Sequence, residues 1–126
     1  MSEANGAIRI LAVDDHPMFR EGLALLLATQ PDMNLVAQAS NGREAIQQFR
    51  QHHPDITLMD LQMPVMNGLD ATVAIRKEFP EAKIIILTTY ESDVQGAMNR
   101  GARAYLLKTH LDKELLGTIR GVHAWK

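Results

Sequence analysis

The chain has 126 residues, of which 46% are hydrophobic and 22% charged, and this balance is typical of one globular domain with a core of its own. The absence of cysteine excludes a disulfide framework, a zinc–thiolate site and a thiol nucleophile, and the formal net charge of −2 argues against direct nucleic-acid binding by this chain. No run approaches the roughly 18 apolar residues that cross a bilayer, and the polar start MSEANGA does not resemble a signal peptide, so we expect a cytoplasmic protein without a membrane contact.

The first half of the chain alternates predicted strands with predicted helices. An apolar run over residues 8–13 predicts a strand, and Pro17 suits the first turn of the helix that follows, where its missing N–H needs no partner. The apolar face of this helix is formed by Phe19, Leu23, Leu26 and Leu27. After a second strand over 35–39, Asn41 is the candidate cap of the next helix, and Glu44 completes the pattern of a capping box. The buried stripe of that helix should consist of Ala45, Ile46 and Phe49.

The second half of the chain repeats this alternation three times. Further strands are predicted over residues 56–59, 83–87 and 104–107. We expect the helices between and after them to begin at Gly68, at Glu91 or Ser92, and near Leu111, with Gly101 ending the second of these. Their apolar positions are Leu69 and Val73, then Val94, Ala97 and Met98, then Leu115, Ile119 and Val122. Five strands alternating with five helices predict a single α/β domain over 1–126, with a parallel sheet covered on both faces.

Polar side chains that can carry chemistry follow directly after predicted strands. Asp14 and Asp15 follow the first strand, Asp60 the third, Thr88 the fourth and Lys108 the fifth. Ligands of open α/β sheets bind outside the carboxyl ends of the strands, so we expect these five residues to converge on one edge. Taken singly, each could be a helix cap, a turn residue or a solvated charge, and it is their joint placement that favours a site.

Three carboxylates at one edge repel one another strongly. At a separation of about 4 Å and an effective dielectric constant near 20, each pair contributes roughly 4 kcal/mol of repulsion, and three pairs together rival the stability of a whole domain, about 5–15 kcal/mol. One lysine cannot offset this, so the site must bind a cation, take up protons or hold its acids farther apart. Oxygen donors favour Mg²⁺ or Mn²⁺ over zinc. The five histidines fall on different elements and are interpreted as surface or helix-end residues rather than metal ligands: His16, His52, His53, His110 and His123.

Four motifs in this order and spacing resemble the receiver domain of bacterial two-component response regulators over essentially the whole chain. They are VDDH at 13–16, LMDLQMPVMNG at 58–68, ILTTY at 86–90 and GARAYLLKT at 101–109. The wording DDHPMFREGLALLL and GARAYLLK is most similar to the subgroup whose full-length members carry a LuxR-type helix-turn-helix after the receiver. The resemblance implies a flavodoxin-like (βα)5 fold with a doubly wound sheet in the strand order 2-1-3-4-5.

The resemblance also implies a chemistry for the acids. Asp60 would be the phosphoacceptor, a carboxylate nucleophile that takes a phosphoryl group from the phosphohistidine of a sensor histidine kinase. Mg²⁺ would be held by Asp15, Asp60 and the backbone carbonyl of Gln62, with Asp14 acting largely through water. The domain would assist only its own phosphorylation and dephosphorylation, so it is expected to be a signalling domain and not an enzyme.

The remaining roles implied by the resemblance concern the response to phosphorylation. Lys108 would pair with a phosphoryl oxygen, and the Thr88 hydroxyl would close onto the phosphoryl group. The space that Thr88 leaves would let Tyr105 rotate inward and shift the population of surface conformations. We expect homodimerisation on phosphorylation, through either the first and last helices or the fourth helix, last strand and last helix.

Several positions depart from, or refine, the receiver pattern. Thr109 stands where many receivers have proline after the lysine, so no cis peptide is expected there, and Thr89 is larger than the alanine often found beside the switch hydroxyl. Gln62 and Tyr90 should flank the phosphoryl site and hinder the water that hydrolyses the phosphoaspartate. Pro64 and Gly68 shape the loop after the phosphoacceptor, beneath which Met63 and Met66 should pack, and Trp125 is expected to be a packing or boundary residue.

Other functions remain open at this point. No DNA-reading helix follows Lys126, so the chain is either the receiver of a longer transcription regulator, which we favour, or a stand-alone phosphorelay receiver; a non-phosphorylated adaptor is a further possibility. A Mg²⁺-dependent aspartyl-phosphate hydrolase of the haloacid-dehalogenase type would need Asp-x-Asp after the first strand, and His16 occupies the second position. A flavodoxin-like cofactor carrier would need a phosphate loop in place of DDHPMF, and a metal-dependent nuclease would need a basic patch.

Overall fold

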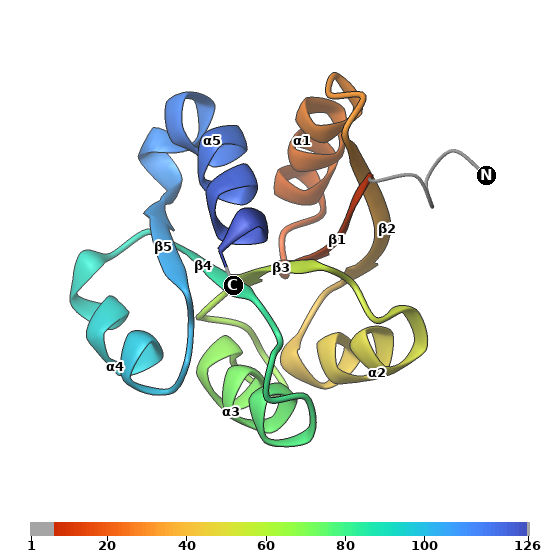
Figure 1. Ribbon diagram of the computed structural model, residues 1–126. Helices are drawn as coiled ribbons and strands as arrows, with labels where there is room; N and C mark the ends of the chain where they lie inside the picture. The colour runs from red at the N-terminus through yellow and green to blue at the C-terminus, as the bar shows by residue number, and fades with distance from the viewer. Residues whose placement is uncertain (1–6, 126) are drawn as a thin grey trace.

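The protein folds into a five-stranded parallel sheet in the order β2-β1-β3-β4-β5, as predicted (Figure 1). The structure is a computed structural model and describes residues 7–125. The strands are β1 (Ile8–Val13), β2 (Met33–Ala39), β3 (Ile56–Asp60), β4 (Ile84–Thr88) and β5 (Ala104–Leu107). The helices are α1 (Pro17–Ala28), α2 (Gly42–His52), α3 (Gly68–Glu78), α4 (Val94–Asn99) and α5 (Leu111–Ala124). Two 3₁₀ turns, η2 (Glu91–Asp93) and η3 (Lys108–His110), precede α4 and α5.

The helices cover both faces of the sheet, with α1 and α5 on one face and α2, α3 and α4 on the other (Figure 1). Alternate residues of each central strand therefore enter different cores. In β4, Ile85 and Leu87 pack with α1 and α5, whereas Ile84 and Ile86 pack against the opposite helices. This double burial explains why the central strands are continuous apolar runs.

The observed strands differ from the predicted ones at their ends. Backbone pairing, and not side-chain polarity, determines where these strands begin and end. β2 begins at Met33, two residues early, because Met33 pairs with Ile8 in the parallel ladder. β3 and β4 each extend one residue further than predicted, so that Asp60 and Thr88 are the last residues of their strands. The main consequence is that an acid and a hydroxyl are fixed by sheet pairing and not by a loop.

The ends of the helices confirm some of the expected caps. The Asn41 side chain accepts a hydrogen bond from the Glu44 N–H at 2.9 Å, as predicted. The prediction of the second bond of the capping box was wrong. The Glu44 carboxylate accepts hydrogen bonds from the N–H and the hydroxyl of Ser40 and not from the Asn41 N–H. In α3 the buried face includes Ala71 and Ile75, and Val73 is exposed.

The structure does not describe residues 1–6 or Lys126. The predictions about the polar start of the chain and about its end at Lys126 therefore lie outside the described residues. Within residues 7–125, no helix is both long enough and apolar enough to span a bilayer. No cis peptide occurs in this range either, which agrees with the expectation for Thr109.

Candidate functional site

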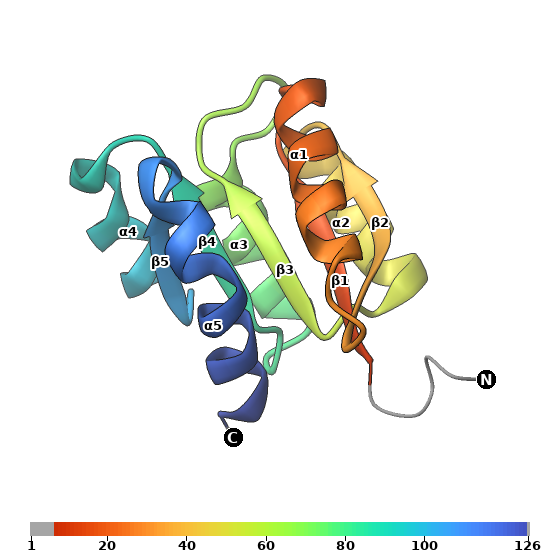
Figure 2. The same ribbon diagram turned by 90° about the horizontal axis from the view of Figure 1, so that it is seen from above.

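The carboxyl ends of the parallel strands lie at one edge of the sheet (Figures 1 and 2). The predicted polar residues gather at this edge. Val13 of β1 pairs with Met59 of β3, so Asp14 and Asp60 are the next residues on two neighbouring strands. Both carboxylates are buried, with 1% of Asp14 and 6% of Asp60 exposed. Sheet register thus places two acids side by side in a setting where water screens them poorly.

Lys108 is the cation of this edge. Its Nζ lies 2.6 Å from Asp14 Oδ2 and 3.5 Å from Asp60 Oδ1, and its side chain is 16% exposed. The lysine enters from the end of β5, across the sheet from Asp14, as the strand-end pattern predicts. One positive charge therefore interacts with two buried negative charges.

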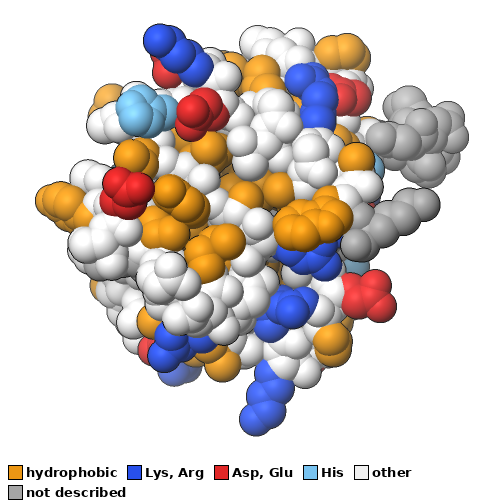
Figure 3. Space-filling view, turned by 60° about the vertical axis from the view of Figure 1, so that its left-hand side comes forward, with side chains coloured by type: hydrophobic (Ala, Val, Ile, Leu, Met, Phe, Trp, Pro, Cys, Tyr) orange, Lys and Arg blue, Asp and Glu red, His pale blue; other side chains and the backbone are white. Residues whose placement is uncertain are grey.

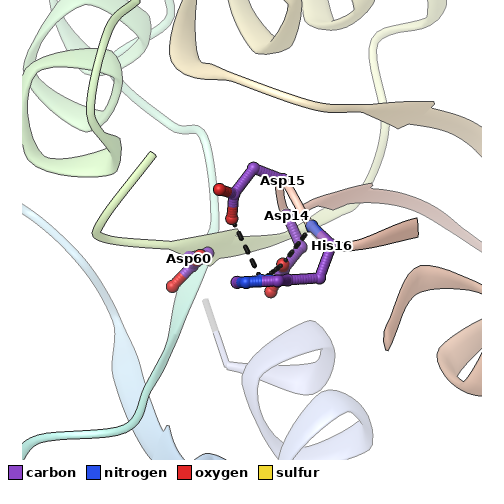
Figure 4. A group of neighbouring side chains, drawn as sticks. All are labelled: Asp14, Asp15, His16 and Asp60. Carbon is purple, nitrogen blue, oxygen red and sulfur yellow. Dashed lines mark hydrogen bonds and ion pairs between the residues drawn. The ribbon is translucent and has the colours of Figure 1, made fainter. Parts of the chain in front are cut away.

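Asp14, Asp15, His16 and Asp60 form a cluster that can hold a metal ion (Figure 4). Each offers one ligand atom, and these atoms all lie within 4.8 Å of one another. Oδ1 of Asp15 is buried and accepts no hydrogen bond from the described residues; Nδ1 of His16 lies 3.1 Å from it but is closer to Asp14 Oδ1, at 2.9 Å. A buried acceptor without a donor is costly, and a cation would satisfy it. The donor set present thus fits a hard divalent ion.

His16 is the residue of this site that the sequence interpretation missed. It lies at the helix end, as expected, and caps α1 without a side-chain hydrogen bond to the helix. Its Nδ1, however, lies 2.9 Å from Asp14 Oδ1 and 3.1 Å from Asp15 Oδ1. The available signal was its position directly between the acidic pair and Pro17, which holds it beside the acids when the helix begins. The other four histidines belong to no such cluster in the part of the chain that the structure describes.

The electrostatics of the cluster raise the pKa of the Asp60 carboxyl group above its usual value. Burial is the largest cause, and the negative charge of Asp14 is the next. The ammonium of Lys108 opposes both by favouring the ionised form. Without a further cation, the edge therefore holds more negative charge than its lysine neutralises.

A cavity of about 150 Å³ opens beside Asp60. It is lined by His16, Asp60, Gln62, Thr88, Thr89, Tyr90 and Lys108. The hydroxyl of Thr88 does not engage the acids: it donates to the carbonyl of Tyr90 and accepts from the Tyr90 N–H, each at 3.3 Å. The predicted flanking positions of Gln62 and Tyr90 at this cavity are confirmed.

Tyr105 points outward from β5. It is 38% exposed, and its hydroxyl donates to Glu91 Oε2 at 3.3 Å. This hydrogen bond ties β5 to the 3₁₀ turn that precedes α4. The outward orientation is one of the two that the predicted switch requires.

Two backbone arrangements hold the acids in place. Arg20 of α1 donates through Nη1 to the carbonyl of Asp14 and through Nε to Gln38 Oε1 at 3.2 Å, which links the end of β1 to β2. On the other side, the Gly68 N–H donates to the Leu61 carbonyl at 2.9 Å, so the loop after Asp60 returns closely to β3. The role of Gly68 in this loop was predicted from the sequence, whereas that of Arg20 was not, because its partner Gln38 lies on β2.

The loop between Asp60 and α3 makes a tight turn at Val65. Val65 has a φ of +68°, and the Met66 N–H donates to the Pro64 carbonyl at 2.7 Å, which closes a γ-turn. The Met66 carbonyl then accepts from the Gly42 N–H at 2.7 Å, which fastens the loop to the start of α2. Met63 packs against the core on this face, as expected.

Comparison with known proteins identifies a protein family that matches most of the chain. Residues 10–120 match the family model described as the response regulator receiver domain. The chain is 38% identical over 115 residues to the response regulator protein VraR of Staphylococcus aureus, covering 90% of this chain and 55% of that protein. The chain thus spans about half the length of the curated relatives it matches.

Solved structures agree with this family and with the fold. A LuxR-family two-component response regulator from Aurantimonas sp. SI85-9A1 is 36% identical with a TM-score of 0.89, over 94% of this chain and 86% of that one. The response regulator domain of Thermotoga maritima CheB is 30% identical with a TM-score of 0.90, over 95% of this chain and 98% of that one.

Proposed function

The chain belongs to the response regulator receiver family, and from this premise we propose that Asp60 accepts a phosphoryl group from the phosphohistidine of a sensor histidine kinase. The observation that carries the proposal is the shared lysine: one ammonium lies 2.6 Å from Asp14 and 3.5 Å from Asp60, beside a cavity that opens onto Asp60. This is an arrangement that can neutralise an anionic donor as it approaches an anionic nucleophile.

In the proposed reaction, an oxygen of the Asp60 carboxylate forms the new P–O bond while the P–N bond of the phosphohistidine breaks and the histidine nitrogen keeps the electron pair. The carboxylate must be ionised to attack. Lys108 favours that form, whereas burial and Asp14 oppose it. Lys108 can then shift from Asp14 toward the phosphoryl oxygens on Asp60, because Asp14 and Asp60 both lie close to the same ammonium.

Mg²⁺ is the ion we assign to the acidic cluster, with Asp15, Asp60 and the backbone carbonyl of Gln62 as the groups that would hold it and Asp14 acting largely through water. The unsatisfied oxygen of Asp15 supports this assignment. When bound, the ion would cancel charge on the transferring phosphoryl group. His16 lies close enough to the same acids to be an outer partner of the site.

Thr88 and Tyr105 are the residues we propose for the response. In the part of the chain that the structure describes, the Thr88 hydroxyl makes two long hydrogen bonds, both to the Tyr90 backbone, so a phosphoryl group on Asp60 can compete for it. Movement of Thr88 toward Asp60 would free space for Tyr105, whose outward position is held by Glu91. The outcome is a shift of population at α4, β5 and α5 and not a new fold.

The function of the whole protein follows as a further proposal. We favour a cytoplasmic transcription regulator in which this domain, over 1–126, is linked to a helix-turn-helix DNA-binding domain and dimerises on phosphorylation. The similarity to LuxR-family regulators and the partial coverage of VraR support this reading over a stand-alone phosphorelay receiver. The domain assists only its own phosphorylation and dephosphorylation. The hydrolase alternative is disfavoured because His16 occupies the position where that chemistry needs a second aspartate.

Phosphorylation by a small donor tests the proposal directly. The protein is incubated with acetyl phosphate and Mg²⁺, and its intact mass is measured beside an Asp60→Asn variant and a metal-chelated sample. Wild type should gain one phosphoryl group, and neither of the other two should. Asp70→Asn removes an exposed acid of α3 outside the cluster and should label like wild type. Equal labelling of Asp60→Asn, or none of wild type, contradicts the proposal.

A further inference from the structure

The ammonium of Lys108 has a third neighbour, the aromatic ring of Phe19. Nζ lies 4.5 Å from the ring centroid, in addition to its contacts with Asp14 and Asp60. Phe19 belongs to the first turns of α1 and packs, partly buried, against the core formed with α5. The ring is therefore fixed by the fold and is not a mobile surface group.

Lys108 lines both a cavity and a groove, and Phe19 lines the groove. The cavity is the one beside Asp60. The groove, of about 280 Å³, lies between α1 and α5 and is lined by Phe19, Lys108, Asp112 and their neighbours. A lysine side chain has several rotatable bonds, and the groove offers it an exposed carboxylate, that of Asp112. The two buried carboxylates attract the ammonium to the acid edge, and the exposed carboxylate of Asp112 competes with them.

We propose that Phe19 is a positioning residue that keeps the Lys108 ammonium at the acid edge. The face of an aromatic ring carries partial negative charge and attracts an ammonium, more strongly where water is excluded. Unlike a third carboxylate, the ring does not neutralise the lysine, so the ammonium stays free to shift from Asp14 toward a phosphoryl oxygen. The ring also lines the groove together with Lys108 and Asp112.

This inference rests on the proposed phosphorylation of Asp60, and the test keeps the two apart by adding a readout that needs no phosphoryl donor. Protons held over an aromatic face resonate upfield, so the ε-methylene protons of Lys108 should be shifted in the spectrum of wild type. Phe19→Leu keeps an apolar side chain and removes the ring, so that shift should disappear. Phe19→Tyr keeps the ring and should retain the shift.

The rate of Asp60 phosphorylation by acetyl phosphate is the second readout. Phe19→Leu should slow it about two- to fivefold, the effect expected from loss of one partly exposed cation–π contact, with Mg²⁺ affinity unchanged. Phe19→Tyr should stay near the wild-type rate. Leu26→Ala is the matched control, because Leu26 packs partly buried against the same core as Phe19 and offers Lys108 no aromatic ring. It should loosen α1 without slowing the reaction.

A double variant tests the groove. Adding Asp112→Asn to Phe19→Leu removes the competing carboxylate and should recover a measurable part of the lost rate. The inference is wrong if Phe19→Leu matches wild type in both readouts, if Phe19→Tyr is as slow as Phe19→Leu, or if the double variant stays as slow as the single one. Failure of wild type to accept phosphate overturns the proposed function instead, and the spectrum of Lys108 still decides the position of the ammonium.

Discussion

Burial and the negative charge of Asp14 destabilise the ionised form of the Asp60 carboxyl group, and both effects raise its pKa. An acid with a raised pKa binds its proton more tightly in the folded protein than in the unfolded chain. The free energy of unfolding therefore falls as pH rises from the unfolded pKa, near 3.8, through the higher folded pKa. At neutral pH and without a metal ion, the ionised Asp60 makes the domain less stable.

Asp60→Asn should therefore raise the free energy of unfolding at about pH 7 in the presence of a chelator, and the advantage should vanish below the unfolded pKa, near 3.8. The reason is that the variant lacks the buried charge at high pH and resembles the protonated acid at low pH. Urea unfolding at both pH values measures this difference. The control is Asp70→Asn, which should show no such pH-dependent gain; a gain that persists unchanged at low pH would refute the electrostatic explanation.

Tyr90 is 61% exposed and lines the cavity together with Asp60 and Gln62. Its ring can restrict the approach of water to a phosphoryl group in that cavity. We expect Tyr90→Ala to shorten the lifetime of the phosphoaspartate, at least about twofold, by admitting water to the site.

The lifetime is measured as loss of the added mass after the donor is removed. Tyr90→Phe keeps the ring and should decay like wild type. Equal lifetimes for Tyr90→Ala and wild type would show that the ring does not control access of water.

Residue-scale features were predictable where they follow strand register and were missed where they depend on distant contacts. Asp14, Asp60 and Lys108 were placed correctly because parallel strands bring their carboxyl ends together. Arg20 was missed because its partner Gln38 lies on β2, and no local pattern pairs the two. His16 was placed at a helix end, but its approach to the acids depends on the backbone turn between β1 and α1.

At the scale of elements, the return of the chain from β3 into α3 depends on one glycine. A Cβ atom at Gly68 would overlap the carbonyl oxygen of Asp60 and lie 2.8 Å from its carbonyl carbon. Both are backbone atoms of a buried strand, so they cannot move aside as a flexible side chain would. The same close approach positions Asp60, the proposed phosphoacceptor, which couples the stability of the loop to the geometry of the site.

Gly68→Ala should lower the free energy of unfolding by about 2–3 kcal/mol and slow phosphorylation of Asp60, because overpacking against fixed backbone has no easy relief. Gly117→Ala is the matched control: Gly117 lies inside α5, and an added methyl group would meet no atom within 4 Å. That variant should gain up to about 1 kcal/mol from helix propensity. Urea unfolding compares the two, and equal effects at both positions would contradict the steric argument.

Element boundaries were the least predictable part of the fold for a physical reason. Apolar runs mark where a strand is buried, whereas the ladder of backbone hydrogen bonds decides where it ends, and β2 gained two residues that are paired with β1. The segment before α4 was predicted as helix and forms a 3₁₀ turn first. Neither pairing nor the type of the first turn is encoded in side-chain periodicity.

At the scale of the whole molecule, the site lies at the carboxyl ends of the strands, whereas exposed apolar side chains lie on α1 and on the surface formed by α4, β5 and α5 (Figure 3). The site occupies the edge where β1 and β3 end, at the point where the strand order reverses (Figure 2). Apolar side chains gather on the side formed by α4, β5 and α5 (Figure 3). Exposed apolar residues also occur on α1, where Met18 and Leu25 are 84% and 73% exposed. Each of these two faces could bury apolar area in a dimer.

The two faces predict opposite results for two variants of phosphorylated protein. Leu25→Glu places a charge on the α1 face, and Gln95→Glu places one on the exposed side of α4, on the α4–β5–α5 face. If dimers form through α4, β5 and α5, Gln95→Glu should weaken dimerisation at least about tenfold, because burial of an unpaired charge costs more than about 1.4 kcal/mol, and Leu25→Glu should not. If they form through α1 and α5, the two results exchange.

Sedimentation of each variant before and after acetyl phosphate measures the dimer constant, with intact mass confirming equal phosphorylation. The control is Asp60→Asn, which should remain at the unphosphorylated level of dimer whichever face is used. Phosphorylation that leaves the wild-type constant unchanged would remove dimerisation from the proposed response. The apolar side chains on both faces would then need another partner, which in a longer regulator is most simply the covalently linked effector domain.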